Sequence, residues 1–141
     1  MRSTLIALGT VWTLPNTLLG LLAGFVLLPF GARLHFAEGA LAFKRVPRTH
    51  GALVLGCVIL HGGEDLDIIC RTYAARCGEA SPDQRVRIGD HERAHVYQYL
   101  LFGPLFLPLY FLCGGVSARN PFERAADRYA LTGKGWDPFL R

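Results

Sequence analysis

The first 32 residues place the strongest limit on how this chain can fold. Residues 3–32 carry no charge, and residues 5–30 would extend about 39 Å as a helix, more than the ~30 Å hydrocarbon core of a bilayer. Pro15 interrupts the run, so the sequence predicts one kinked spanning helix or a helical hairpin that dips into the bilayer, with Asn16 or Thr17 capping the second helix. A cleaved signal peptide is a third interpretation, but the run is too long for one. We therefore expect an uncleaved membrane segment.

Composition and flanking charges suit a membrane location. Hydrophobic residues make up 51% of the 141 residues and charged residues only 18%, which favours membrane lipid as a partner. Lys44, Arg45 and Arg48 follow the apolar segment, whereas only Arg2 precedes it. The positive-inside bias then places the following domain in the cytoplasm, and we expect a bacterial inner membrane. The arginines form no dense basic run interleaved with aromatic residues, which argues against nucleic acid as a partner.

The remaining chain is long enough for one modest domain. We expect the membrane segment over residues 1–32, the domain over residues 33–131 and an irregular tail over residues 132–141. The cysteines form no CxxC pair and are read as reduced thiols, which agrees with a cytoplasmic domain. They are Cys57, Cys70, Cys77 and Cys113.

The sequence of the first half of this domain predicts a small antiparallel sheet of about three strands. Residues 33–46 alternate apolar and polar side chains around Glu38-Gly39, as a β-hairpin does. Residues 52–60 form a continuous apolar run of strand length. Residues 64–77 carry apolar side chains on one helical stripe and acidic residues in the first turn, which predicts a helix.

A metal-binding pattern follows. His91 and His95 are four residues apart, so they share one face of a helix for which Asp90 is a suitable N-cap. Two imidazoles at this spacing can bind one Zn²⁺ at about 2.0–2.1 Å. Glu92, beside them, can take a proton from a water molecule.

A second helix start lies at Asn120-Pro121, where Asn caps and Pro occupies the first helical position. Glu123 and Asp127 are four residues apart on this helix. Each has an alternative role: Glu123 can close a capping box onto Asn120, and Asp127 can pair with Arg124 or Arg128 on the surface.

The two patterns together resemble the gluzincin metallopeptidases, the thermolysin-like branch of the zincins, over about residues 90–130. The resemblance implies that His91, His95 and Glu123 bind zinc and that Glu92 is the general base. It implies that Asp127 orients a ligand histidine. It also implies that an apolar strand before the motif helix, here residues 52–60, pairs with an extended substrate. The same pair of motifs is similar to that of small bacterial membrane proteins, for which the resemblance implies no substrate.

The two motifs can share a metal only if the chain between them stays on one side of the membrane. Residues 100–115 are apolar, but as a helix they would extend about 24 Å, less than the ~30 Å core, and Pro104 and Pro108 interrupt them. We therefore expect this segment to turn back and bring two helices together.

The sequence thus predicts an α+β protein in which a membrane helix or hairpin precedes the sheet and the two zincin-like helices. The predicted function is membrane-associated, zinc-dependent hydrolysis of peptide bonds in a peptide or protein substrate. The alternative is a non-catalytic membrane protein with a structural or vestigial zinc site that acts through partner binding. Activity can also require a homo-oligomer or the membrane surface. His61 is a reserve ligand, and a tyrosine can stabilise the oxyanion; the candidates are Tyr97, Tyr99, Tyr110 and Tyr129.

Overall fold

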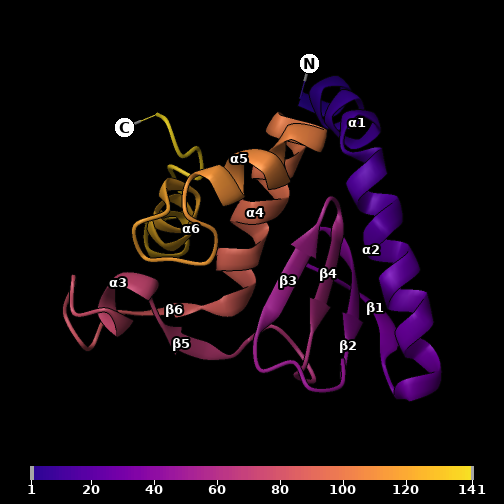
Figure 1. Cartoon of the computed structure of the whole chain (residues 1–141), viewed down its shortest axis with the longest axis horizontal. Helices are drawn as coiled ribbons and strands as arrows, with labels where there is room; N and C mark the ends of the chain where they lie inside the picture. The colour runs from indigo at the N-terminus through magenta and orange to yellow at the C-terminus, as the bar shows by residue number, and fades with distance from the viewer. Residues whose placement is uncertain (1, 141) are drawn as a thin grey trace.

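The structure, a computed structural model, describes residues 2–140 and is α+β, as the sequence predicts (Figure 1). A four-stranded sheet has the order β1-β2-β4-β3, and a separate two-stranded sheet joins β5 to β6. The hairpin of residues 33–46 is confirmed. Strand β1 (Arg33–Ala37) pairs antiparallel with β2 (Ala40–Lys44), and both turn residues, Glu38 and Gly39, have positive φ.

The apolar run of residues 52–60 is two strands, not the single strand that its length predicts. Strand β3 (Ala52–Leu55) and strand β4 (Val58–His61) form a second tight hairpin. Gly56 turns the chain at φ 64°, where a Cβ atom would lie 2.3 Å from Thr17 Oγ1. Strand β4 pairs parallel with β2, so the sheet is mixed and the prediction of a purely antiparallel sheet was wrong.

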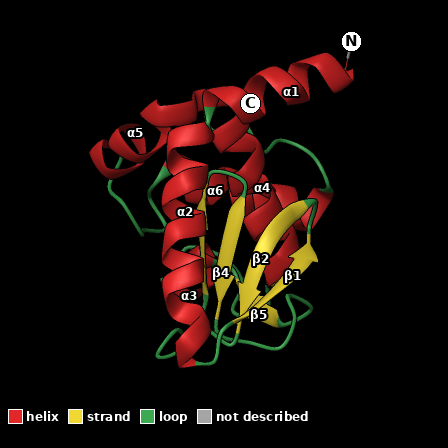
Figure 2. Ribbon diagram, turned by 90° about the vertical axis from the view of Figure 1, so that its right-hand side faces the viewer, coloured by secondary structure: helices red, strands yellow, loops and turns green. Residues whose placement is uncertain are grey.

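The buried strand β4 separates two layers of side chains. Successive side chains of a strand point to opposite faces, and here Val58 and Leu60 pack toward helix α2 (Leu14–Leu27) while Ile59 packs toward helix α4 (Ile88–Phe102). Figures 1 and 2 show α2 along one face of the sheet and the later helices beyond its other face. A strand covered on both faces has no polar face, which explains why alternation does not reveal it.

The helix predicted over residues 64–77 is absent from the described residues, and this prediction was wrong. The segment instead contains strand β5 (Ile69–Arg71), which pairs with β6 (Arg85–Arg87), and one short helix, α3 (Tyr73–Arg76). Its acidic residues bind basic side chains elsewhere: Glu64 pairs with Lys44 and Arg45, and Asp67 with Arg87. Strand pairing and long-range ion pairs therefore outweigh the local preference of this segment for a helix.

The N-terminal segment forms helix α1 (Arg2–Trp12), α2 and a short 3-10 helix, η1 (Leu28–Phe30). The break falls at Thr13, the N-cap of α2, so Asn16 and Thr17 lie inside this helix and the prediction that one of them caps it was wrong. Among the described residues, no single helix has the length and apolar character to cross a bilayer, so the expected spanning helix finds no support. Residues 6–12 and 14–30 together have the length and apolar composition to cross a bilayer, but they form a pair of helical segments bent by 68°.

Helix α2 is packed directly against the sheet. A Cβ atom on Gly20 would lie 2.8 Å from Val58 Cβ, and one on Gly24 would lie 2.2 Å from the Phe43 ring, so only glycine allows this approach. The opposite face of α2 is apolar and exposed; it carries Leu18, Leu19, Leu22, Phe25 and Val26.

The chain after α4 turns back, as the metal hypothesis requires. Helix α4 is followed by the 3-10 helix η2 (Gly103–Leu105), helix α5 (Phe106–Leu112) and helix α6 (Pro121–Thr132). Helices α4 and α6 pack side by side (Figure 1). Asn120 caps α6 as predicted, since its Oδ1 accepts from the Phe122 N–H at 3.0 Å. Asp90 does not cap α4, which begins two residues earlier, at Ile88.

Candidate metal centre

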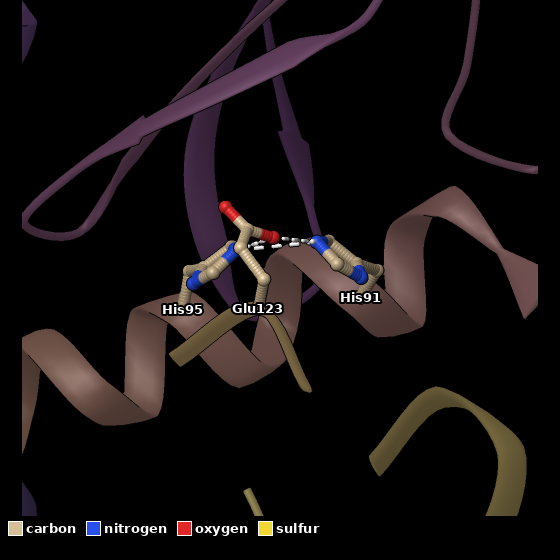
Figure 3. A group of neighbouring side chains, drawn as sticks. All are labelled: His91, His95 and Glu123. Atoms are coloured by element: carbon tan, nitrogen blue, oxygen red, sulfur yellow. Dashed lines mark hydrogen bonds and ion pairs between the residues drawn. The ribbon is translucent and has the colours of Figure 1, made fainter. Parts of the chain in front are cut away.

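His91 and His95 of α4 and Glu123 of α6 point toward one another (Figure 3). His91 Nε2 lies 3.2 Å from His95 Nε2 and 3.0 Å from Glu123 Oε2. His95 Nε2 lies 3.4 Å from the same carboxylate oxygen. All three side chains are buried. This buried group can bind a metal ion, because three ligand atoms of suitable type face one point.

The outer nitrogen of each histidine is held by a second residue. His91 Nδ1 lies 3.0 Å from Asp127 Oδ1, and His95 Nδ1 lies 2.8 Å from Gln98 Oε1. The Gln98 amide nitrogen donates to the carbonyls of Phe122 and Trp136, so its oxygen must accept from His95 Nδ1–H. The His95 tautomer therefore presents a lone pair on Nε2 to the centre.

Gln98 is a residue that the sequence analysis missed. It lies three residues after His95 and so shares its helix face, but a glutamine at this spacing is common and points to no particular chemistry. The residue is fully buried, and its contacts come from α6 and the C-terminal tail. Only the folded chain reveals them.

Glu123 does not close the capping box that its position allows. Its Oε2 faces the histidines, and its other oxygen accepts a hydrogen bond from the Tyr110 hydroxyl. Tyr110 thus contacts a ligand. Asn120 fixes this part of the site, since its Nδ2 donates to the carbonyls of Tyr110 at 3.0 Å and Gly115 at 2.7 Å.

Asp127 also departs from its alternative role. It pairs with neither Arg124 nor Arg128; Arg128 donates instead to backbone carbonyls of the C-terminal tail. The second carboxylate oxygen of Asp127 accepts the Tyr73 N–H at 2.9 Å. Asp127 therefore joins His91 to the start of α3.

The carboxylates make this centre attractive to a cation. Burial lowers the pKa of His91, but hydrogen bonds to Asp127 and Glu123 outweigh it and raise that pKa to about 10. Burial alone would raise the pKa of Glu123, yet the two histidines hold it well below its usual range. A site that stabilises a charged imidazole in this way also favours a metal cation.

Glu92 is buried next to the two histidines and makes no hydrogen bond or ion pair within residues 2–140. Burial raises the pKa of its carboxyl group, although the charges of His91 and His95 act in the opposite direction. A carboxylate with a raised pKa and no fixed partner is suited to accept a proton.

Two cavities border the centre, and Ala52, Tyr73, His91 and Glu92 line both of them. The larger, of about 230 Å³, is also lined by polar residues from β4, β5 and α3. The smaller, of about 140 Å³, is mainly apolar, with lining residues that include Leu53, Val54, Tyr99, Phe106, Leu107 and Phe111.

The other residues singled out in the sequence lie around this centre without joining it. His61 lines the larger cavity but is not part of the three-ligand group; its Nε2 lies 2.8 Å from His35 Nε2. Tyr97 and Tyr129 pack against each other. Tyr99 lines the smaller cavity, and its buried hydroxyl has no partner within the described chain.

Tyr73 is a second residue that the sequence analysis missed. Its ring lies 5.8 Å from that of His91, and burial, with the charges of Glu123 and Glu92, raises its pKa to about 12. Its hydroxyl therefore stays protonated at neutral pH and can donate a hydrogen bond. The segment was read as part of one long helix, which hid this position.

No protein-family model matches the chain, and neither the curated proteins nor the solved structures include a significant match.

Proposed function

We propose that this protein is a membrane-associated, zinc-dependent peptidase of the gluzincin type. The observation that carries the proposal is the convergence of His91 Nε2, His95 Nε2 and Glu123 Oε2, with the buried Glu92 carboxyl beside them. These residues come from two helices joined by a segment that turns back, which is the arrangement that the motif pair requires.

The geometry supports zinc. A tetrahedral ion with ligand distances of about 2.0–2.1 Å has ligand atoms separated by about 3.3–3.4 Å. The three atoms in the centre are separated by 3.0, 3.2 and 3.4 Å. Two imidazoles and one carboxylate form a ligand set typical of catalytic zinc, and Asp127 and Gln98 supply the outer contacts that such histidines need.

The site favours catalysis over a structural role. Structural zinc sites are generally closed by four protein ligands, whereas catalytic sites keep one position for water or substrate. Among the described residues only three ligand atoms converge, and two cavities border them. The non-catalytic alternative would leave both the cavities and the free Glu92 carboxyl without a role.

In the proposed hydrolysis, the bound metal, Glu92 and Tyr73 have separate roles. Bound zinc would polarise the scissile carbonyl and lower the pKa of a water molecule to near 7. Glu92 takes the proton as the water oxygen attacks the carbonyl carbon, and returns it to the amine nitrogen as the C–N bond breaks. Tyr73 lines both cavities, and in this proposal its protonated hydroxyl donates a hydrogen bond to the oxyanion.

Strand β3 supports a peptide substrate. It lies at the edge of the four-stranded sheet and pairs only with β4 within the described residues. An edge strand can hydrogen-bond an extended peptide. Ala52 of β3 lines both cavities, so a peptide along this strand would cross the metal centre.

The exposed apolar surface supports membrane association. The outer faces of α1 and α2 expose large apolar side chains, and so do β1 and α5; among them are Val11, Leu22, Phe25, Phe36 and Leu112, each at least half exposed. Large apolar side chains exposed in such number commonly contact lipid or another protein. Lys44 and Arg45 beside it agree with the cytoplasmic leaflet.

Metal analysis and Glu92→Gln together test the function. We expect the purified chain to bind one Zn²⁺, and His91→Ala to lose it. Glu92→Gln should keep zinc and lose at least about 100-fold in peptide hydrolysis, since general base catalysis contributes roughly 10²–10⁴-fold. Glu79→Gln, an exposed change outside both cavities that border the centre, should keep full activity. Equal hydrolysis by wild type and Glu92→Gln would overturn the catalytic role, and absence of zinc would overturn the metal site.

A further inference from the structure

The larger cavity beside the metal centre contains two arginines that nothing in the proposed chemistry uses. Arg71 ends strand β5 and Arg76 lies in α3, and both line this cavity together with His91 and Glu92. The Arg76 guanidinium lies over the Tyr73 ring, 5.3 Å from its centroid. Such stacking restricts a guanidinium and leaves its N–H groups at the ring edge for hydrogen bonds.

Neither arginine forms an ion pair with a described residue. By contrast, Arg87 and Arg93 bind the buried carboxylate of Glu38. Three carboxyl groups also line the cavity, but none of them forms an ion pair with either arginine. Asp127 binds His91 and the Tyr73 N–H, Glu92 adjoins the two histidines, and Asp65 accepts the N–H of Asp67. None of the ion pairs among the described residues joins one of these carboxyl groups to Arg71 or Arg76.

A buried histidine in the same cavity lacks a hydrogen-bond partner. His61 is 2% exposed, and its Nδ1 makes no hydrogen bond within the described chain. Its Nε2 is taken up by His35, at 2.8 Å. An unpartnered buried polar atom at a cavity wall indicates a missing ligand.

We infer that this cavity is a subsite for a carboxylate of the substrate, bound by Arg71 and Arg76, with the unpartnered Nδ1 of His61 at its wall. The inference rests on the proposed peptidase function and specifies its substrate class. In peptides the anionic groups are carboxylates, either the side chain of Asp or Glu or the C-terminus. A guanidinium matches a carboxylate through two parallel hydrogen bonds.

The smaller cavity adds a preference for an apolar residue of the substrate. It is mainly apolar and shares Ala52, His91 and Glu92 with the first. A peptide that crosses the metal centre therefore has an apolar subsite on one side and the arginine subsite on the other. The preferred substrate carries a large apolar residue and a carboxylate on opposite sides of the scissile bond.

Peptide binding tests this preference without depending on hydrolysis. The full chain with Glu92→Gln and added Zn²⁺ would be titrated with acetyl-Ala-Leu-Glu-Ala-amide and acetyl-Ala-Glu-Leu-Ala-amide, and with the same peptides carrying Gln for Glu. We expect one Glu peptide to bind about tenfold or more tightly than its Gln counterpart, the effect of one charge-assisted contact. The same Gln peptides would also be titrated with a free C-terminus in place of the amide. Tighter binding of these peptides would show that the subsite takes the C-terminal carboxylate.

The double variant Arg71→Gln/Arg76→Gln should abolish this difference and leave the affinity for the Gln peptides unchanged. Arg33→Gln/Arg124→Gln removes the same charge from exposed positions outside the cavity and should keep the preference. Equal binding of all peptides, or a preference that survives the loss of Arg71 and Arg76, would overturn the subsite. Selective binding without hydrolysis by the wild type would overturn the peptidase proposal alone.

Discussion

Asp127 and Gln98 determine how the two histidines face the centre. A histidine can rotate about its side-chain bonds and exchange tautomers, so two imidazoles at i and i+4 do not by themselves form a site. Here a carboxylate holds His91 Nδ1 and a buried amide holds His95 Nδ1. The Nε2 atoms are thereby fixed before a metal binds, which lowers the entropy lost on binding.

Asp127→Asn should weaken zinc binding by about 10–100-fold, the usual effect of losing an outer contact to a ligand histidine. The amide retains the size of the carboxylate but removes the charge that stabilises the His91 ring. Competition with a chromophoric chelator measures the affinity. Asp83→Asn, an exposed change, should leave it unaltered. Unchanged zinc affinity in Asp127→Asn would show that this contact serves folding only.

The sequence predicts the ligands better than the groups around them. His91 and His95 meet because of helix periodicity, and the spacing from Glu123 to Asp127 follows the same rule on a second helix. Gln98, Tyr73 and Tyr110 depend on contacts between elements far apart in the chain. No local pattern encodes such contacts, so sequence reasoning passed over Gln98 and Tyr73 and gave Tyr110 no specific partner.

At the level of elements, the sheet joins the N-terminal helices to the metal centre. Helix α2 packs on one face of the sheet, while α4, with both histidines, packs on the other. The turn of the first hairpin also reaches α4, because the buried Glu38 binds Arg87 and Arg93. Movement of the sheet would therefore displace the ligands.

Gly24→Ala tests this connection. The added methyl group would lie 2.2 Å from the Phe43 ring, and Phe43 is fully buried, so the helix or the ring must move. We expect a loss of about 1–3 kcal/mol in the free energy of unfolding, measured by denaturant titration. Gly51→Ala is the matched control, since nothing lies within 4 Å of its Cβ position. Equal stability of the two variants would contradict close packing of α2 on the sheet.

The predicted elements fail where burial or pairing overrides local pattern. Residues 52–60 lack alternation because β4 is buried on both faces, so the turn at Gly56 was read as part of one strand. Residues 64–77 satisfy a helical stripe, yet β5 forms there because β6 supplies its hydrogen bonds. The hairpin of residues 33–46 was predicted correctly because Leu34 and Phe36 alternate with polar residues before the Glu38-Gly39 turn, although both of these apolar side chains are exposed.

Across the whole molecule, the exposed apolar face of α2 and the metal centre lie on opposite sides of the four-stranded sheet. The exposed face of α2 lies on the side of the sheet opposite α4 and α6 (Figures 1 and 2). If this face contacts lipid, the centre stays outside the hydrocarbon and open to water. That arrangement suits a hydrolase, which needs water at its active site.

Three arginines on the outer face of α2 should detach the protein from membranes. Leu18, Leu22 and Val26 lie on one helix face and are 55%, 63% and 57% exposed, so their replacement leaves the contact between Phe25 and Phe43 of the sheet intact. An arginine in the hydrocarbon region costs roughly 2.5–3.5 kcal/mol on insertion scales. We therefore expect the triple-arginine variant of α2 to lose flotation with anionic lipid vesicles and to keep its zinc binding. Arginine at three other exposed apolar positions, away from α2, forms the control, and this variant should float like the wild type; the positions are Ile69, Leu131 and Leu140. Flotation of the α2 variant equal to wild type would show that another surface meets the membrane, and a wild type that does not float would remove membrane association from the proposal.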